Sequence, residues 1–152
     1  MNRRERAEAA FLSGCNCAQA VVSAFADLLP LDAETALRLS SPFGGGLGRQ
    51  REVCGAVSGM CLVAGFLYGQ SDVSDPAEKT RVYAMTQELC RAFREKNGHI
   101  VCRELLGLSE GPSSPAATPR TPDFYKKRPC SAYVGDAAEI LERYLAEHTE
   151  KA

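Results

Sequence analysis

The sequence lacks tryptophan, has only two histidines, and contains no pair of cysteines in the CxxC spacing. Without that pair, neither a zinc ribbon nor a thioredoxin-type motif is present. The net charge of −1 gives no electrostatic support for nucleic-acid binding, which we do not expect. The glycine-rich stretch 44–48 is not followed by Gly-Lys-Ser or Gly-Lys-Thr, which excludes a phosphate-binding P-loop.

Long apolar segments are also missing. The uncharged run from Gly55 to Tyr68 falls short of the roughly 20 residues that a membrane-spanning helix needs. The charged residues from Met1 to Arg6 are not followed by an apolar segment of the signal-peptide type. We therefore expect no membrane span and a cytoplasmic location.

Cysteine, in contrast, is abundant. There are seven: Cys15, Cys17, Cys54, Cys61, Cys90, Cys102 and Cys130. An odd number without a signal peptide argues against a secreted disulfide scaffold. In a reducing compartment, this many cysteines indicate metal binding, redox chemistry or packing in the core.

Apolar periodicity and helix caps predict an all-α protein, a compact bundle of about five main helices. Asn16 with Gln19 predicts a capping box, and Asp75-Pro76 predicts a second helix start. The length suits one domain, so we expect a single helical domain over 1–152. The expected helices are 3–12, 17–29, a short one after Asp32, 54–68, 76–97, the short segment 101–106 and 131–147. Two loops interrupt them, the Gly-rich loop 44–48 and the Gly/Ser/Pro-rich segment 107–123.

Glycines surround the start of the expected helix 54–68. We interpret the loop 44–48 as clearance that lets Cys54 and backbone N–H groups approach a ligand or another loop. Gly45, Gly46 and Gly55 are the predicted cofactor-contacting residues. Further along this helix, Cys61, Gly65 and Gly69 recur every four residues, a spacing that favours close approach of another helix.

Four of the cysteines fall at expected helix starts: Cys17, Cys54, Cys102 and Cys130. Helix N-termini carry unpaired N–H groups and a positive dipole end, which stabilise a thiolate over a thiol. Basic residues next to Cys54, Cys102 and Cys130 act in the same direction. We therefore predict lowered pKa values for these thiols, as metal ligation and thiol exchange both require.

The remaining candidates have simpler interpretations. Cys61 and Cys90 are expected to pack as small apolar side chains, whereas Cys15 either does the same or holds a second thiol near Cys17. A solvated loop position is favoured for His99 over a role beside Cys102. His148 is expected to be inert.

Several short motifs occur together in one order. They are Asn16–Val21, Gly44–Gly48, Cys54–Gly59, Cys102–Gly107 and the late Cys130. From residue 14 to about 135, the sequence resembles the redox-active family named C_GCAxxG_C_C, small single-domain proteins with four characteristic cysteines. The resemblance implies that Cys17, Cys54, Cys102 and Cys130 are those four. It assigns no counterpart to Cys15, Cys61 or Cys90.

Two mechanisms fit a convergent set of four thiols. They could exchange electrons through disulfides with an unidentified redox partner, as in a thiol-based oxidoreductase. Alternatively, the same four cysteines could hold an iron–sulfur cluster or zinc. A different class of function is a metal-binding or partner-docking helical module without turnover. Because Cys54 and Cys61 lie about 10 Å apart along one helix, Cys54 must find its partners on other helices.

Overall fold

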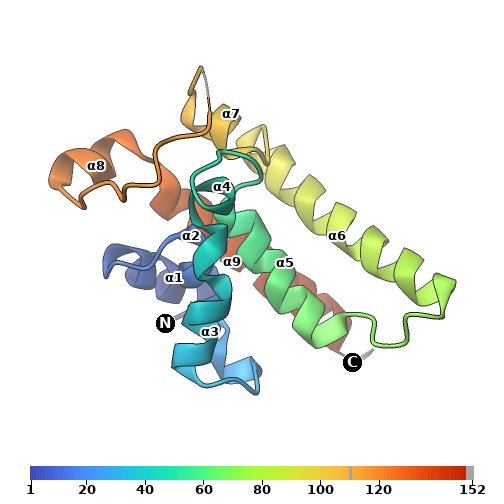
Figure 1. Ribbon diagram of the computed structural model, residues 1–152. Helices are drawn as coiled ribbons and strands as arrows, with labels where there is room; N and C mark the ends of the chain where they lie inside the picture. The colour runs from blue at the N-terminus through green and yellow to red at the C-terminus, as the bar shows by residue number, and fades with distance from the viewer. Residues whose placement is uncertain (110, 150–152) are drawn as a thin grey trace.

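The computed structural model describes residues 1–109 and 111–149, and these residues form an all-α protein, as the sequence predicts (Figure 1). The helices are α1 Arg3–Leu12, α2 Cys17–Ala24, α3 Ala33–Ser40, α4 Gly44–Leu47, α5 Gly55–Tyr68, α6 Pro76–Asn97, α7 Cys102–Leu106, α8 Pro122–Lys127 and α9 Cys130–His148. Two short 3₁₀ turns, η1 Ala26–Leu28 and η2 Ser41–Phe43, complete the described secondary structure. None of the described helices combines the length and apolar character that a membrane crossing requires.

Local capping explains why the main helices begin where they do. The Asn16 side chain accepts a hydrogen bond from the N–H of Gln19, whose own side chain accepts one from the N–H of Asn16. This confirms the predicted capping box of α2. The Asp75 side chain caps α6, with Pro76 at its first position, and Gly98 follows its last residue with a φ of 90°. The predicted start and end of α6 are therefore confirmed.

Three expectations about the elements were wrong. The predicted Gly-rich loop 44–48 contains the short helix α4, although Gly45 and Gly46 within it have non-helical φ values of 66° and 67°. The helix expected to reach Leu29 ends at Ala24, because Phe25 leaves the helical conformation and the chain tightens into η1. The segment 107–123, expected to be loop throughout, gives way at Pro122 to α8. The Thr121 side chain caps this helix and Pro122 occupies its first turn. Thr121 followed by Pro122 is a helix-start signal that was visible in the sequence.

α5 is packed on several sides, and close approach of helices determines where it lies. It contacts α2, α6 and α9, while α1 packs against both α2 and α9. A Cβ atom added to Gly59 would stand 2.8 Å from the carbonyl oxygen of Ala18, so α2 and α5 need glycine there. Gly65 has nothing within 4 Å of such an atom. The close approach of α2 to α5 is therefore made at Gly59, whereas Gly65 faces open space.

Candidate functional site

Each of the four predicted site cysteines lies at a helix start. Cys17, Cys102 and Cys130 are the first residues of α2, α7 and α9, and Cys54 is the N-cap of α5. Their places in the helices agree with the sequence prediction. The four elements are far apart in the chain, so only the fold decides whether the thiols meet.

The four cysteines meet at one small cavity of about 30 Å³. We call it the cysteine cavity. Its wall consists of Cys17, Cys54, Cys102 and Cys130, the glycines Gly45, Gly46 and Gly55, and Arg51, Leu105, Leu106 and Tyr133. All of the predicted cysteines and glycines thus line a single space. A cavity of this size has room for about one water molecule or one ion.

The segment 44–53 brings α5 and α7 together at this cavity. The N–H of Cys54 donates to the carbonyl of Ile100 at 2.8 Å, and the N–H of Cys102 donates to the carbonyl of Glu52 at 2.6 Å. Val53 and Val101 form an isolated antiparallel bridge between these hydrogen bonds. These hydrogen bonds join residues far apart in the chain. They hold the start of α5 against the start of α7, with Cys54 on one side of the contact and Cys102 on the other.

The glycines give room to Cys17 and Cys102 more than to Cys54. A Cβ on Gly46 would lie 2.8 Å from the Cβ of Cys102, and one on Gly55 would lie 3.1 Å from the Cβ of Cys17. Gly45 and Gly46 have φ values of 66° and 67°, which disfavour other residues. The predicted clearance therefore exists, but it serves two other cysteines.

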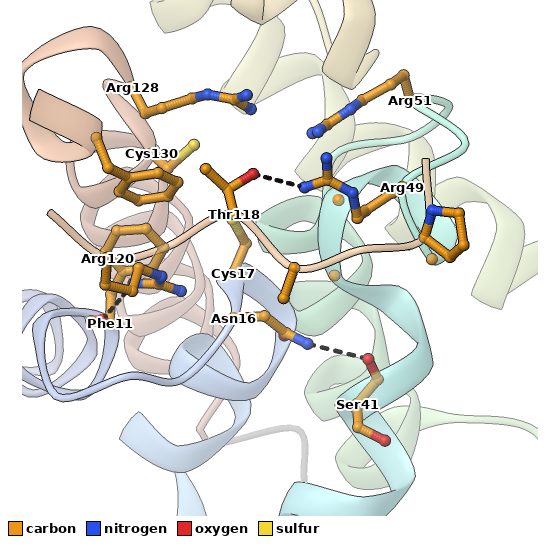
Figure 2. A pocket seen from close by; sticks show the side chains of 16 residues that line it. Phe11, Asn16, Cys17, Ser41, Arg49, Arg51, Thr118, Arg120, Arg128 and Cys130 are labelled. Atoms are coloured by element: carbon orange, nitrogen blue, oxygen red, sulfur yellow. Dashed lines mark hydrogen bonds between the residues drawn. The ribbon is translucent and has the colours of Figure 1, made fainter. Parts of the chain in front are cut away.

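A larger pocket of about 360 Å³ opens beside the cysteine cavity (Figure 2). We call it the arginine pocket. Cys17 and Cys130 line both spaces, whereas Cys54 and Cys102 line only the cysteine cavity and are 5% and 7% exposed. We call Cys17 and Cys130 the outer thiols, because they form part of the wall of the arginine pocket, and Cys54 and Cys102 the inner thiols.

The arginine pocket is named for the four arginines in its lining: Arg49, Arg51, Arg120 and Arg128. Arg51 is only 3% exposed. One of its guanidinium nitrogens lies 3.6 Å from the sulfur of Cys102, and its Nε donates to the Oγ of Ser113 at 2.9 Å. The sequence places Arg51 beside Cys54, but in the fold its guanidinium group meets a different cysteine.

The other basic neighbours seen in the sequence also separate in space. Arg103 follows Cys102 but pairs with Glu52 at 3.9 Å. Lys127 is exposed and pairs with Asp123, whereas the next residue, Arg128, lines the arginine pocket. Arg120 was missed because no cysteine stands near it in the sequence. Sequence proximity to cysteine is therefore a poor guide to which cations reach the site.

The pKa values of Cys54 and Cys17 are raised, contrary to the sequence prediction. Burial raises the pKa of Cys54 to about 12, and this outweighs hydrogen bonds from the N–H groups of Ala56 and Val57 at the helix start. The hydrogen bond with Cys130, followed by burial, raises the pKa of Cys17. Desolvation thus opposes the helix-terminus effect at the enclosed positions.

Cys130 differs from Cys17 and Cys54. Its pKa is lowered, because its sulfur accepts a hydrogen bond from the Cys17 thiol and because guanidinium groups stabilise its thiolate, those of Arg128, Arg51 and Arg120. Thiolates are the nucleophiles of cysteine chemistry. Cys130 is therefore the better nucleophile of the outer pair.

The other three cysteines lie outside both spaces. Cys15 is half-buried, and its carbonyl accepts a hydrogen bond from Arg120 at 2.9 Å. Cys61 on α5 and Cys90 on α6 share a thiol hydrogen bond, which lowers the pKa of Cys90 to about 7 and raises that of Cys61. Both are half-buried against the core, and their pairing was not visible in the sequence.

The geometry favours neither the histidines as site residues nor the four cysteines as metal ligands. His99 is exposed and lines neither space, whereas the ring of His148 stacks on Tyr144 with centroids 3.9 Å apart. Over residues 1–109 and 111–149, no three Cys, His, Asp or Glu side chains stand in positions that could hold a metal ion. The four thiols line one cavity without forming a ready set of metal ligands.

Comparison with known proteins gives one match, to a family. No curated protein and no solved structure matched the chain. A family model does match, over residues 15–144, which is most of the chain and includes all four cysteines of the cavity. The chain therefore belongs to the family described as "Putative redox-active protein (C_GCAxxG_C_C)".

Proposed function

We propose that the chain is a thiol-based oxidoreductase in which Cys17 and Cys130 form an outer redox pair and Cys54 and Cys102 an inner one. The observation that carries this proposal is that all four cysteines line one cavity and that two of them, Cys17 and Cys130, also line the adjoining pocket. Membership of a family named for redox activity supports the same reading. Free thiols of this kind fit the reducing cytoplasm, the compartment we propose.

The chemistry follows from the different exposure of the two pairs. The Cys130 thiolate attacks one sulfur of a disulfide RSSR, its S–S bond breaks, and one RS⁻ leaves and takes up a proton. The Cys17 sulfur then attacks Cys130 in the mixed disulfide, and the second RS⁻ leaves with a proton. The balance is one protein dithiol plus RSSR giving one protein disulfide plus two RSH.

The inner pair extends this cycle. Exchange between the Cys17–Cys130 disulfide and the thiols of Cys54 and Cys102 regenerates the outer dithiol and leaves the oxidation on the enclosed cysteines. A dithiol reductant from the redox partner then returns the protein to its reduced form. Because the inner thiols are almost fully buried, this second redox pair is shielded from direct reaction with other disulfides in solution.

A zinc site is the second candidate function. In its favour, four thiols surround a space of about 30 Å³, which suits a single ion better than an iron–sulfur cluster of several iron and sulfide atoms. Cys17, Cys54, Cys102 and Cys130 would hold the ion, which would close the site structurally. Their positions as they stand do not form such a ligand set, and the thiol redox proposal is therefore preferred.

Anaerobic purification followed by oxidation distinguishes these functions. The reduced protein is treated with oxidised dithiothreitol and its disulfides are mapped by peptide mass spectrometry, with Cys15→Ser as a matched control because Cys15 lines neither space. We expect disulfides within the set of four cysteines in both proteins. Stoichiometric zinc that protects the four thiols would replace the proposal by the second candidate. Four free thiols that stay reduced, without metal, would refute both.

A further inference from the structure

The arginine pocket has a size and lining that suit a small ligand. Its volume of about 360 Å³ lies within the roughly 300–1,000 Å³ typical of small-molecule sites. Cys17 and Cys130 form part of its wall, so a ligand in this pocket would contact the outer redox pair. Figure 2 shows the side chains of Arg49, Arg51 and Arg128 pointing toward one another across the pocket.

Three of the pocket's arginines, Arg49, Arg51 and Arg120, donate hydrogen bonds to groups other than carboxylates, and the guanidinium carbon of Arg128 lies 5.8 Å from the ring centroid of Phe124. Arg49 donates to the carbonyl of Ser114 at 2.6 Å and to the hydroxyl of Thr118 at 3.0 Å. Arg120 donates to the backbone carbonyls of Phe11 and Cys15. Within the part of the chain that the structure describes, no ion pair involves Arg49, Arg51, Arg120 or Arg128, and no carboxylate lines the pocket.

By contrast, two arginines of α1 are neutralised by carboxylates. Arg3 pairs with Asp27, and Arg4 pairs with Asp136 and Glu139. A buried cation without a counter-charge is costly, and Arg51 is 3% exposed. Repulsion from Arg51 and Arg128 adds to burial in lowering the pKa of Arg49. The pocket thus concentrates positive charge that an anionic ligand would neutralise.

Backbone conformation holds two of these arginines in place. Arg49 and Arg51 have φ values of 70° and 63°, in the left-handed region that residues other than glycine rarely adopt. Strained positions of this kind persist only where the surrounding structure enforces them, and they gather at ligand sites. The N–H of Ser113 donates to the carbonyl of Arg49 at 2.8 Å, which ties the segment 113–118 to this wall of the pocket.

An apolar wall completes the pocket. The guanidinium carbon of Arg120 lies 4.4 Å from the ring centroid of Phe11 and 4.9 Å from that of Phe124. Phe11 and Phe124 line the pocket together with Pro115 and Ala117. The arrangement of charged groups around an apolar surface fits a ligand with anionic ends and an uncharged middle.

We propose that the arginine pocket binds small organic disulfides that carry two or more carboxylates and presents their sulfur atoms to Cys130. This assignment rests on the proposed function, since it names the substrate class of the outer redox pair. The reaction is the exchange given above, with RSSR an anionic disulfide that accepts two electrons from Cys17 and Cys130 and leaves as two anionic thiols. The arginines bind the carboxylates and the apolar wall contacts the carbon chain.

Three disulfides of similar size and different charge test the substrate class. The reduced protein is mixed at low salt with 3,3′-dithiodipropionate, 2-hydroxyethyl disulfide or cystamine, which are anionic, neutral and cationic. We expect kcat/KM to fall in that order by about tenfold or more per step, mostly through KM, and the differences to shrink as salt rises. Equal rates for all three disulfides would overturn the proposal.

Variants locate the charge that selects the substrate. Arg49→Gln and Arg128→Gln should each lower the ratio of kcat/KM for the anionic disulfide to kcat/KM for the neutral one by about tenfold or more. Arg128→Gln should also slow both disulfides, because Arg128 stabilises the Cys130 thiolate. Lys127→Gln is the matched control, because Lys127 is the neighbour of Arg128 but lies outside the pocket and pairs with Asp123. Equal effects of Lys127→Gln and Arg128→Gln would mean that the positive potential of the surface in general, and not the pocket, selects the substrate. That result would contradict the proposal.

Binding without chemistry separates this proposal from the redox function. Suberate has the chain length and carboxylates of 3,3′-dithiodipropionate, with carbon in place of sulfur. It is titrated calorimetrically into the Cys17→Ser/Cys130→Ser protein. Binding that Arg49→Gln weakens supports the pocket even if no disulfide is ever reduced. Disulfide reduction without suberate binding or charge preference would leave the redox function standing and refute the anionic substrate class.

Discussion

The molecule holds two groups of paired thiols that differ in how the fold makes them. At the start of α5, Cys54 joins three cysteines from three other helix starts, and a strained glycine-rich loop brings them to one cavity. Farther along α5, Cys61 meets only Cys90, its neighbour on the adjacent helix α6. The first group requires long-range organisation of the chain, whereas the second follows from two helices lying side by side.

The two groups also differ in what controls the thiols. Burial raises the pKa of Cys54 to about 12, whereas the Cys61 hydrogen bond and the charge of Arg94 lower the pKa of Cys90 to about 7. A thiol with a lowered pKa thus also occurs outside the proposed redox centre. Low pKa alone does not mark the site, because a single neighbouring thiol can produce it. The convergence of several thiols beside a cationic pocket is the more informative sign.

The largest expected effect separates the two groups by activity. Cys130→Ser removes the attacking sulfur and should lower the rate of 3,3′-dithiodipropionate reduction by about 100-fold or more. Cys90→Ser changes a thiol of similar exposure outside the cavity and should keep the rate within about twofold of the wild type. The measurement is thiol release under anaerobic conditions. Equal losses in both variants would show that the two groups act as one.

A smaller effect compares two glycines. Gly46→Ala places a Cβ 2.8 Å from Cys102 and from the backbone of Glu52, at a φ of 67°, and should destabilise the fold by about 1–3 kcal/mol. Gly65→Ala adds its methyl group to open space within α5 and should stabilise by about 0.5–1 kcal/mol. Urea unfolding measures both. A neutral Gly46→Ala would mean that the loop does not need its close approach to Cys102.

The smallest effect is a difference in pH dependence. Because the thiolate is the reactive form, alkylation of Cys90 by iodoacetamide should rise steeply with pH around its pKa of about 7 and level off above it. Cys54, with a pKa of about 12, should stay unmodified over the same range. Peptide mass spectrometry follows each site.

A variant of Cys61 tests the cause of that difference. Cys61→Ala removes the thiol that donates to Cys90 and should move the midpoint of Cys90 alkylation to higher pH. Cys15→Ala, which changes a cysteine outside this pair, is the control and should leave the midpoint in place. An unchanged midpoint in Cys61→Ala would assign the low pKa to Arg94 instead.

Much of the fold could be predicted because helix signals are local. The capping box at Asn16 and Gln19 and the Asp75-Pro76 start each lie within a few residues of sequence. The end of α2 at Ala24 and the helix α8 were missed. The first depends on how Phe25 packs in the core, which no local pattern gives, and the second was a cap signal masked by neighbouring prolines.

The candidate site could likewise be predicted only in part from the sequence. The sequence placed four cysteines at helix starts, but it assigned Arg51 to Cys54 when the guanidinium group lies against Cys102. It also predicted lowered pKa values, whereas the hydrogen bond with Cys130 raises the pKa of Cys17 and burial raises that of Cys54. Neighbours in space and the degree of burial are products of tertiary packing, so neither could be read from residues adjacent in the chain.

By itself, the sequence determined most of the helices, the caps of α2 and α6, the positions of the four cysteines at helix starts and the family to which the chain belongs. Only the tertiary structure decided that the thiols share one cavity, that two of them open to a pocket of arginines, and that Cys61 meets Cys90. The physical reason is the distance along the chain over which each kind of interaction acts. Caps and helix periodicity act over a few residues. The cavity depends instead on backbone hydrogen bonds between residues that are about 50 positions apart in the chain, from Cys54 to Ile100 and from Cys102 to Glu52.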